Sequence, residues 1–228
     1  LKTKVGNLEI IKTKKIFMLI DVGDPPQKNF SGSYQSGPLS FELFFNNEKV
    51  ITNCGYGKNI SKKIEILSRL TSAQSTLTLN DTSVVNFERN NIINKVFGRS
   101  IKETFKINDV ERKEDEIFIN LSAKHNAYDK KYGYFFKRSF KVNKKDESIV
   151  GQDTLIKSKD NVAKANFNIR FHLYPGISAV PTMGGNSILI QINKNSSLIF
   201  FSKNESLTLE KSIFMGRNQL INNYCINI

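Results

Sequence analysis

Residues 167–173 read Phe-Asn-Ile-Arg-Phe-His-Leu, and this stretch decides the fold class. Its apolar side chains alternate with Asn168, Arg170 and His172, which is the period of a β-strand with one buried and one exposed face. The same alternation recurs in residues 117–121 and 188–192. Strands of this kind need a second layer to cover their apolar faces, so the pattern predicts two packed sheets.

Further short β-prone runs fill most of the chain, separated by Gly, Asn, Asp or Lys. Strands are predicted at 8–11, 15–22, 39–45, 49–53, 75–79, 116–123, 132–142, 148–155, 166–174, 187–192, 197–202, 206–210 and 219–226. Turns are expected at Asn46-Asn47, Asn80-Asp81, 144–146 and 193–195, a helix at 62–70, and a long irregular excursion at 87–109. We therefore predict an all-β fold, an antiparallel β-sandwich of many short strands with at most one or two short helices, in one domain over residues 1–228.

The chain has a formal net charge of +13, which favours anionic partners. Abundant Lys, Asn and Ile are also what an AT-rich genome encodes, and the lysines are scattered along the chain. Without a basic helical stripe or a Gly-flanked aromatic pair, no nucleic-acid binding is expected. The longest apolar run, residues 16–20, is far shorter than the roughly 20 residues of a membrane helix, so no membrane span is expected either.

Familiar catalytic and metal-binding signatures are missing from the sequence. It contains no phosphate-binding Gly-Lys-Ser/Thr loop, no Cys-x-x-Cys pair and no His-Glu-x-x-His segment. Its two histidines, His125 and His172, exclude a three-histidine metal site built from this chain alone. The two cysteines, Cys54 and Cys225, lie far apart and are expected to be free core residues.

Three segments near the N-terminus stand in an informative order. They are Tyr-Gln-Ser-Gly-Pro-Leu-Ser-Phe-Glu-Leu at 34–43, Val-Ile-Thr-Asn-Cys-Gly at 50–55, and Thr-Ser-Ala-Gln-Ser-Thr-Leu-Thr-Leu-Asn-Asp at 71–81. Together with segments 125–128, 136–138, 171–176 and 209–216, they resemble the C-terminal β-sandwich of heparinase II/III-like polysaccharide lyases. The resemblance extends from the first of these segments to the C-terminus.

The resemblance implies the C-terminal domain of a polysaccharide lyase that acts on acidic, uronate-containing glycans by β-elimination. The alternative is a non-catalytic carbohydrate-binding or structural β-sandwich derived from such a lyase. In the family an N-terminal α/α-toroid supplies much of the cleft. This chain, which starts at Leu1, is therefore expected to be a fragment that is inactive in isolation. The implied partners are an anionic polysaccharide and the protein's own toroid, and the implied setting is a bacterial periplasm or cell envelope.

One departure from the family concerns its metal-binding members, which place a His, an Asp and a His on three successive strands. This chain has Gln35, Asn53 and Gln74 at those positions. Amides lack the imidazole nitrogens and the compensating charge that zinc requires, so we expect no bound metal and no cofactor. The three amides are expected either to bind substrate, by donating to a uronate carboxylate, or to form a structural hydrogen-bonded cluster.

Four further residues are candidates for the chemistry. Tyr34, His125 and Tyr128 are predicted to be catalytic, because lyases of this type commonly use Tyr and His for proton transfer. Tyr34 has the alternative of a sugar-stacking aromatic, and His125 and Tyr128 that of a packed pair in a loop after strand 116–123. Arg138 is predicted to bind a substrate carboxylate, with a solvated strand face as its alternative. His172 is expected to be structural.

Overall fold

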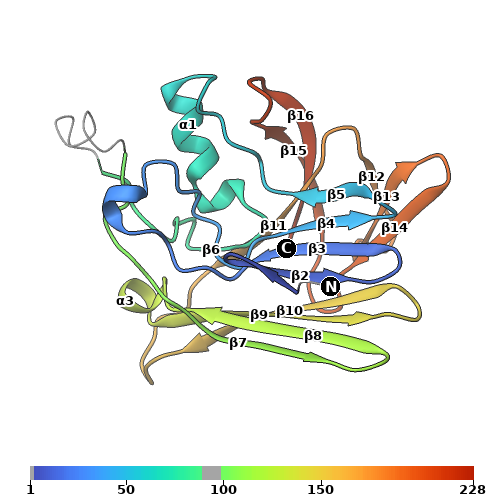
Figure 1. Ribbon diagram of the computed structural model, residues 1–228, viewed down its shortest axis with the longest axis horizontal. Helices are drawn as coiled ribbons and strands as arrows, with labels where there is room; N and C mark the ends of the chain where they lie inside the picture. The colour runs from blue at the N-terminus through green and yellow to red at the C-terminus, as the bar shows by residue number, and fades with distance from the viewer. Residues whose placement is uncertain (1–2, 89–98) are drawn as a thin grey trace.

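Three antiparallel sheets form the body of the computed structural model, which describes residues 3–88 and 99–228 (Figure 1). The largest sheet contains β1 (Lys4–Val5), β2 (Leu8–Lys12), β3 (Ile16–Asp21), β4 (Phe41–Phe45), β5 (Glu48–Thr52), β6 (Leu77–Leu79), β11 (Phe167–Leu173), β15 (Thr208–Phe214) and β16 (Ile221–Asn227). Its order is β1-β2-β3-β4-β5-β11-β16-β15, and β6 pairs with β11.

Two smaller sheets complete the fold. One consists of β7 (Ile107–Glu114), β8 (Phe118–His125), β9 (Tyr134–Asn143) and β10 (Ser148–Lys157), and the other of β12 (Ser178–Pro181), β13 (Ser187–Asn193) and β14 (Ser196–Phe201). The helices among the described residues are α1 (Lys62–Arg69) and α3 (Asp129–Tyr132), with 3-10 turns η1 (Lys28–Phe30) and η2 (Thr71–Ala73). None of these helices is long and apolar enough to cross a bilayer. The predicted all-β sandwich is confirmed.

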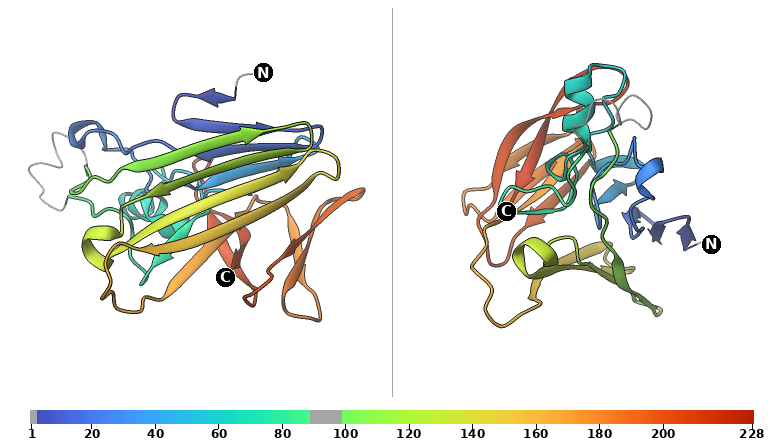
Figure 2. Two further views of the ribbon diagram at one scale, coloured as in Figure 1. Left: turned by 90° about the horizontal axis from the view of Figure 1, so that it is seen from below. Right: turned by 90° about the vertical axis from the view of Figure 1, so that its left-hand side faces the viewer.

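The main core lies between β2–β5 and the β7–β10 sheet, which face each other in both views (Figures 1 and 2). Met18 and Ile20 of β3 and Leu121 of β8 are at most 2% exposed within it. The small β12–β14 sheet joins the same core through Phe200, whose ring centroid lies 4.8 Å from that of Phe171. Because residues from all three sheets share one apolar cluster, removing any sheet would expose the others. The one-domain assignment over residues 1–228 stays a prediction.

Local sequence signals account for several turns and for α1. Asn46 and Asn47 have φ angles of 50° and 65°, the left-handed values that a two-residue hairpin turn requires and that Asn tolerates. The Ser61 hydroxyl accepts a hydrogen bond from the Ile64 N–H at 3.2 Å, which caps α1 at its N-terminus. The turns predicted at 144–146 and 193–195 connect β9 to β10 and β13 to β14.

Some predicted strands differ in detail. Strand β11 alternates only in part, because His172 is 4% exposed and Phe167 is 43% exposed. At its C-terminal end, where β5 and β16 pair with its two edges, side chains on both faces are buried, with Phe171, His172 and Leu173 at 8%, 4% and 0% exposed. Strand β7 begins at Ile107, inside the stretch predicted to be irregular, and residues 89–98 of that stretch lie outside the described residues. Cys54 and Cys225 are buried and free, as predicted.

Arg138 connects β9 to the opposite side of the core. Its Nε and Nη2 atoms donate to Asp153 of β10 at 2.7 and 2.6 Å, and its Nη1 atom donates to the carbonyl oxygens of Leu39 at 3.0 Å and Ser75 at 2.8 Å. The guanidinium also lies 5.5–6.0 Å from four aromatic ring centroids, those of Phe41, Phe136, Phe140 and Phe171. Such a buried, fully hydrogen-bonded charge is specific in geometry and sensitive to loss of either partner.

Replacing Arg138 with Met should lower the free energy of unfolding by about 3–5 kcal/mol, because the Asp153 carboxylate and two carbonyl groups lose their donors inside the protein. Urea unfolding measures this loss. The matched control is Lys106→Ala, which removes an exposed ion pair with Asp24 and should lower the free energy of unfolding by less than about 1 kcal/mol. Equal losses for the two variants would contradict the assigned role of Arg138.

Candidate functional site

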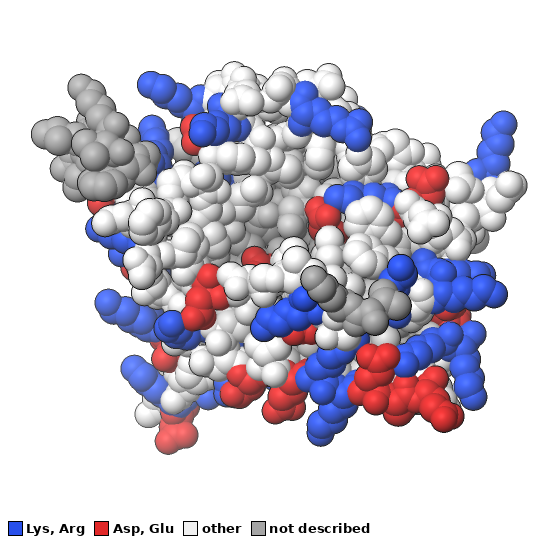
Figure 3. All heavy atoms as spheres, viewed as in Figure 1, with Lys and Arg blue, Asp and Glu red and all other residues white. Residues whose placement is uncertain are grey.

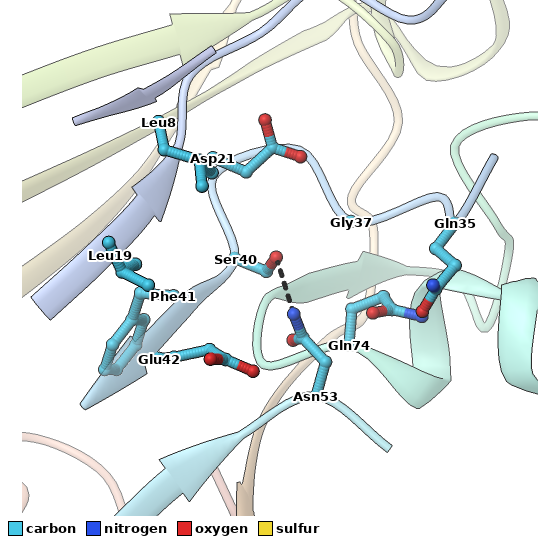
Figure 4. Close-up of a pocket in the computed structure, with 10 residues that line it drawn as sticks. All are labelled: Leu8, Leu19, Asp21, Gln35, Gly37, Ser40, Phe41, Glu42, Asn53 and Gln74. Atoms are coloured by element: carbon cyan, nitrogen blue, oxygen red, sulfur yellow. Dashed lines mark hydrogen bonds between the residues drawn. The ribbon is translucent and has the colours of Figure 1, made fainter. Parts of the chain in front are cut away.

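A cavity of about 240 Å³ opens beside β3, β4 and β5 (Figure 4). Leu19, Asp21 and Glu42 line it, and they alternate along their strands with Ile20 and Phe41, which are buried in the main core. The cavity therefore lies on the side of the large sheet that faces away from β7–β10. The space-filling view shows a hollow near the centre of this face, mostly bordered by uncharged atoms (Figure 3).

The three amides singled out in the sequence meet at this cavity. Gln35 reaches it from the segment before β4, Asn53 from the residue after β5, and Gln74 from the residue after η2 (Figure 4). They are separated by up to 39 positions in the chain, yet all three line one wall. The prediction that they converge is confirmed, whereas their role stays a prediction.

Hydrogen bonds determine what two of these amides present to the cavity. The Asn53 carbonyl oxygen accepts from the Ser75 N–H at 2.8 Å, so its amide nitrogen remains as a donor, with only a long contact of 3.4 Å to the Ser40 hydroxyl. The Gln74 amide nitrogen donates to the carbonyls of Ser68 at 2.9 Å and Leu70 at 3.3 Å, so its own oxygen is left as an acceptor. The wall therefore carries one donor and one acceptor held in place by the backbone.

Two carboxylates that the sequence analysis did not select also line the cavity. Burial raises the pKa of Asp21 to about 6, although the Gly23 N–H partly offsets this by donating to the carboxylate at 3.0 Å. Glu42 accepts from the Lys49 ammonium at 2.7 Å and from the Thr52 hydroxyl at 3.1 Å. Glu42 could have been found from the sequence, because it belongs to the segment 34–43 and alternates with the apolar residues Phe41 and Leu43. Asp21 lies outside that segment, and the sequence gives no comparable signal for it.

Tyr34 precedes Gln35 in the chain but is not among the residues that line the cavity. Its hydroxyl is buried and has no hydrogen-bond partner among the described residues. Burial, and then the carboxylates of Asp21 and Asp24, raise the pKa of Tyr34 well above its ordinary value, so the phenol stays protonated. A protonated phenol can donate a proton but is a poor base, which narrows the catalytic role predicted for this residue.

The backbone beside Tyr34 is held by Arg69, a fully buried residue at the end of α1. The Arg69 guanidinium donates to the carbonyl of Tyr34 and to that of Ser31, both at 2.8 Å. In return, the carbonyl of Arg69 accepts from the Ser36 N–H at 2.9 Å. Hydrogen bonds to Arg69 of α1 therefore hold the chain directly before Gln35, at Tyr34, and directly after it, at Ser36. The sequence analysis missed this residue, since a helical Arg carries no signal of its own.

His125 and Tyr128 occupy a different place from the one predicted. His125 is the last residue of β8 and not a loop residue; it is 1% exposed, and burial lowers its pKa to about 3. Its ring packs against those of Phe105, Tyr128 and Phe136 at centroid distances of 5.4–5.7 Å. Tyr128 is also 1% exposed and donates to the Leu77 carbonyl at 3.1 Å. The predicted loop placement is wrong for His125, whereas Tyr128 does lie in the turn between β8 and α3; both side chains are buried, which supports the packing alternative.

Arg138 and His172 are also structural in their contacts. Arg138 is 3% exposed, and its donors are directed to Asp153 and two carbonyls, so it is not positioned to bind a substrate carboxylate as predicted. His172 places its ring nitrogens 3.0 Å from the Ser72 carbonyl and 3.3 Å from the Ser212 hydroxyl, and burial lowers its pKa to about 4. A neutral, hydrogen-bonded His172 agrees with the predicted structural role.

The cavity does not fit the zinc site of metal-binding family members. Within residues 3–88 and 99–228, no group of three or more His, Cys, Asp or Glu side chains could hold a metal ion. At the three strand positions, the Asn53 oxygen is already bonded to a backbone N–H, and the Gln74 nitrogen is bonded to backbone carbonyls. The donors that remain suit hydroxyl and carboxylate groups, and no step of chemistry is assigned to a metal.

Comparison with known proteins identifies the family. The model of the family described as "Heparinase II/III-like, C-terminal" matches residues 2–226. The crystal structure of a mutant of heparan sulfate lyase HepC from Pedobacter heparinus superposes with a TM-score of 0.73 at 16% identity, over 97% of this chain and 32% of that one. The chain thus spans about a third of that lyase, and the likeness shows a shared fold. No curated protein matches the chain. Since the family model covers nearly all of it, the chain belongs to the heparinase II/III-like C-terminal family.

Proposed function

We propose that this chain is the β-sandwich part of a polysaccharide lyase, and that its cavity contacts an acidic, uronate-containing glycan during β-elimination. The observation that carries the proposal is the convergence of Gln35, Asn53 and Gln74 on one cavity. The family membership and the fold shared with a heparan sulfate lyase support the same reaction class. An N-terminal helical toroid in the complete gene product is part of this proposal.

The cavity can contribute to β-elimination by hydrogen bonding. In that reaction the proton next to the uronate carboxylate leaves, negative charge builds on the carboxylate, and the bond to the glycosidic oxygen breaks. The Asn53 amide nitrogen and the Gln35 amide can donate to this charge, and the Gln74 oxygen can accept from a sugar hydroxyl. A donor aimed at developing charge lowers the barrier, because it is stronger in the transition state than in the ground state.

Proton transfer needs further groups. The catalytic role predicted for Tyr34 stays a proposal: its phenol is protonated and precedes Gln35 in the chain, but its hydroxyl is buried and outside the cavity lining, so it can donate to the leaving glycosidic oxygen only if this wall opens. The base that takes the proton from carbon is assigned to the toroid, because His125 lies in the core and is not accessible. This division of labour explains why the sandwich alone is expected to be inactive.

A non-catalytic glycan-binding role is the second candidate. It is favoured by the cavity's amides and by Asp21, whose polar groups recognise hydroxyls well, and by the absence of a histidine from the cavity lining within the described residues. Under this alternative the protein binds acidic glycan without forming product. Both candidates need Asn53 for binding, and only the first forms an unsaturated uronate.

In the complete gene product, we expect heparan sulfate or alginate to yield unsaturated uronate, followed as a rise in ultraviolet absorbance. Asn53→Ala should reduce kcat/KM by roughly tenfold or more, since a hydrogen bond to a charged group contributes about 1.5–3 kcal/mol. Asn195→Ala, at the exposed β13–β14 turn, is the control and should leave the rate unchanged. Absence of product across a broad panel of acidic glycans would reject the lyase and leave the binding role.

The pKa of Asp21 predicts how binding depends on pH. Below about pH 6 Asp21 gains a proton and the cavity loses a negative charge, whereas a uronate stays ionised above about pH 4. Affinity for acidic glycan should therefore increase roughly three- to tenfold from pH 7 to pH 5. Other groups do not titrate over this range: the pKa of Asp24 is lowered, because the effect of burial is outweighed by its bonds to Lys106 and the Ile107 N–H, and both histidines remain neutral.

Asp21→Asn should bind at pH 7 as tightly as the unmodified protein does at pH 5, with a flat profile between the two. Isothermal titration calorimetry with heparan sulfate measures both affinities. Asp160→Asn removes the same charge from an exposed loop and should keep the original pH profile. A pH dependence that persists in Asp21→Asn would show that another group controls binding.

A further inference from the structure

The β7–β10 sheet has an outer face that no other element covers, as the view from below shows (Figure 2). Residues such as Leu121 of β8 and Phe140 of β9 point into the core, so their neighbours along each strand point outward. The outward set on β7, β8 and β9 consists of Glu111, Lys113, Phe118, Asn120, Ser122, Lys124, Phe135, Lys137, Ser139 and Lys141. This face lies on the side of the sandwich opposite the cavity.

Strand register places the lysines of this face in a defined pattern. Lys124 and Lys137 are directly opposite each other on β8 and β9, a pairing that is unfavourable for like charges. Lys113 and Lys141 lie on either side of Asn120 in the next basic row. From ordinary strand spacing, these rows are about 14 Å apart along the strand, and Lys113 and Lys141 are about 10 Å apart across it.

The charges on this face do not cancel. Lys124 pairs with Asp109 at 2.5 Å, whereas Lys113, Lys137 and Lys141 form no ion pair within 4 Å among the described residues, and Lys141 interacts only at longer range with Asp115. The Lys141 ammonium lies 4.0 Å from the ring centroid of Phe118, which holds that charge over the sheet. Glu111 is the other carboxylate on this face, opposite Ser122. Unpaired lysines on an open sheet are complementary to a polymer that carries repeated negative charges.

We propose that this outer face binds an anionic polysaccharide chain, as a second contact separate from the cavity. The inference rests on the proposed function for the class of polymer. Between the lysines lie Asn120, Ser122 and Ser139, whose amide and hydroxyl groups match the hydroxyls of sugars. The two aromatic rings of this face, Phe118 and Phe135, already have the ammonium groups of Lys141 and Lys124 over them at 4.0 and 5.8 Å from their centroids, which disfavours base stacking and favours a glycan over single-stranded nucleic acid.

The test uses a triple variant, Lys113→Gln, Lys137→Gln and Lys141→Gln, with heparan sulfate as the probe in calorimetry over a series of salt concentrations. Affinity should fall about tenfold and its salt dependence should become shallower, because fewer counterions are released on binding. The matched control removes the same charge at three exposed lysines elsewhere, Lys58→Gln, Lys63→Gln and Lys203→Gln, and should bind as the unmodified protein does. Thermal unfolding confirms that both variants fold.

Equal losses in the two triple variants would overturn the proposal, because net charge alone would then explain binding. A single-stranded oligonucleotide of equal charge that competes as well as heparan sulfate would also overturn it. The cavity variant Asn53→Ala separates this inference from the proposed function, since it should keep the salt-sensitive contact. If Asn53→Ala loses binding while the outer-face variant keeps it, the proposed function stands and this inference fails.

Discussion

The Arg138 guanidinium is the interaction on which the geometry of this sandwich depends. It reaches from β9 across the core and is bound by Asp153 and by the carbonyls of Leu39 and Ser75. Those two residues adjoin Ser40 and Gln74 in the chain, and the N–H of Ser75 also fixes the amide of Asn53. The bond that joins the sheets therefore supports the back of the cavity, so packing and substrate contact are not independent properties of this fold.

The cavity combines three uncharged amide side chains with the carboxylates of Asp21 and Glu42. Backbone groups orient the Asn53 and Gln74 amides, so these amides need not reorganise when they bind a ligand. A hydrogen bond to such an oriented amide is stronger where water is excluded. Burial raises the pKa of the Asp21 carboxylate to about 6, so this group becomes neutral only slightly below neutral pH. A positive set of side chains lies instead on the far face of the sandwich, where Lys137 and Lys141 face solvent. The two proposed contacts with glycan, one by charge attraction and one by hydroxyl recognition, thus lie on opposite faces.

Local and periodic signals in the sequence predicted most of the fold. Asn46-Asn47 specifies its turn because few residues adopt left-handed angles, and α1 follows from its Ser61 cap. The convergence of the three amides was predicted from the order of the motifs along the chain, and not from the chemistry of the side chains. The burial of His125 and Arg138 was missed, although each shares a strand face with apolar residues, Ala123 and Phe136 respectively. Alternation assigns a side chain to a face, but only tertiary packing decides whether that face is covered.

The pairing of β11 determines when the molecule can be completed during synthesis. Residues that line the cavity all lie before position 75, so they are translated before β11 and β16. Their neighbour β5 pairs with β11 through Thr52 and His172, and β11 in turn pairs with β16 near the C-terminus. Contacts so distant in sequence close slowly. The cavity walls are therefore translated before β11 and β16, which extend their sheet, and the apolar faces of β3 and β4 become covered only once β7–β10 have been made.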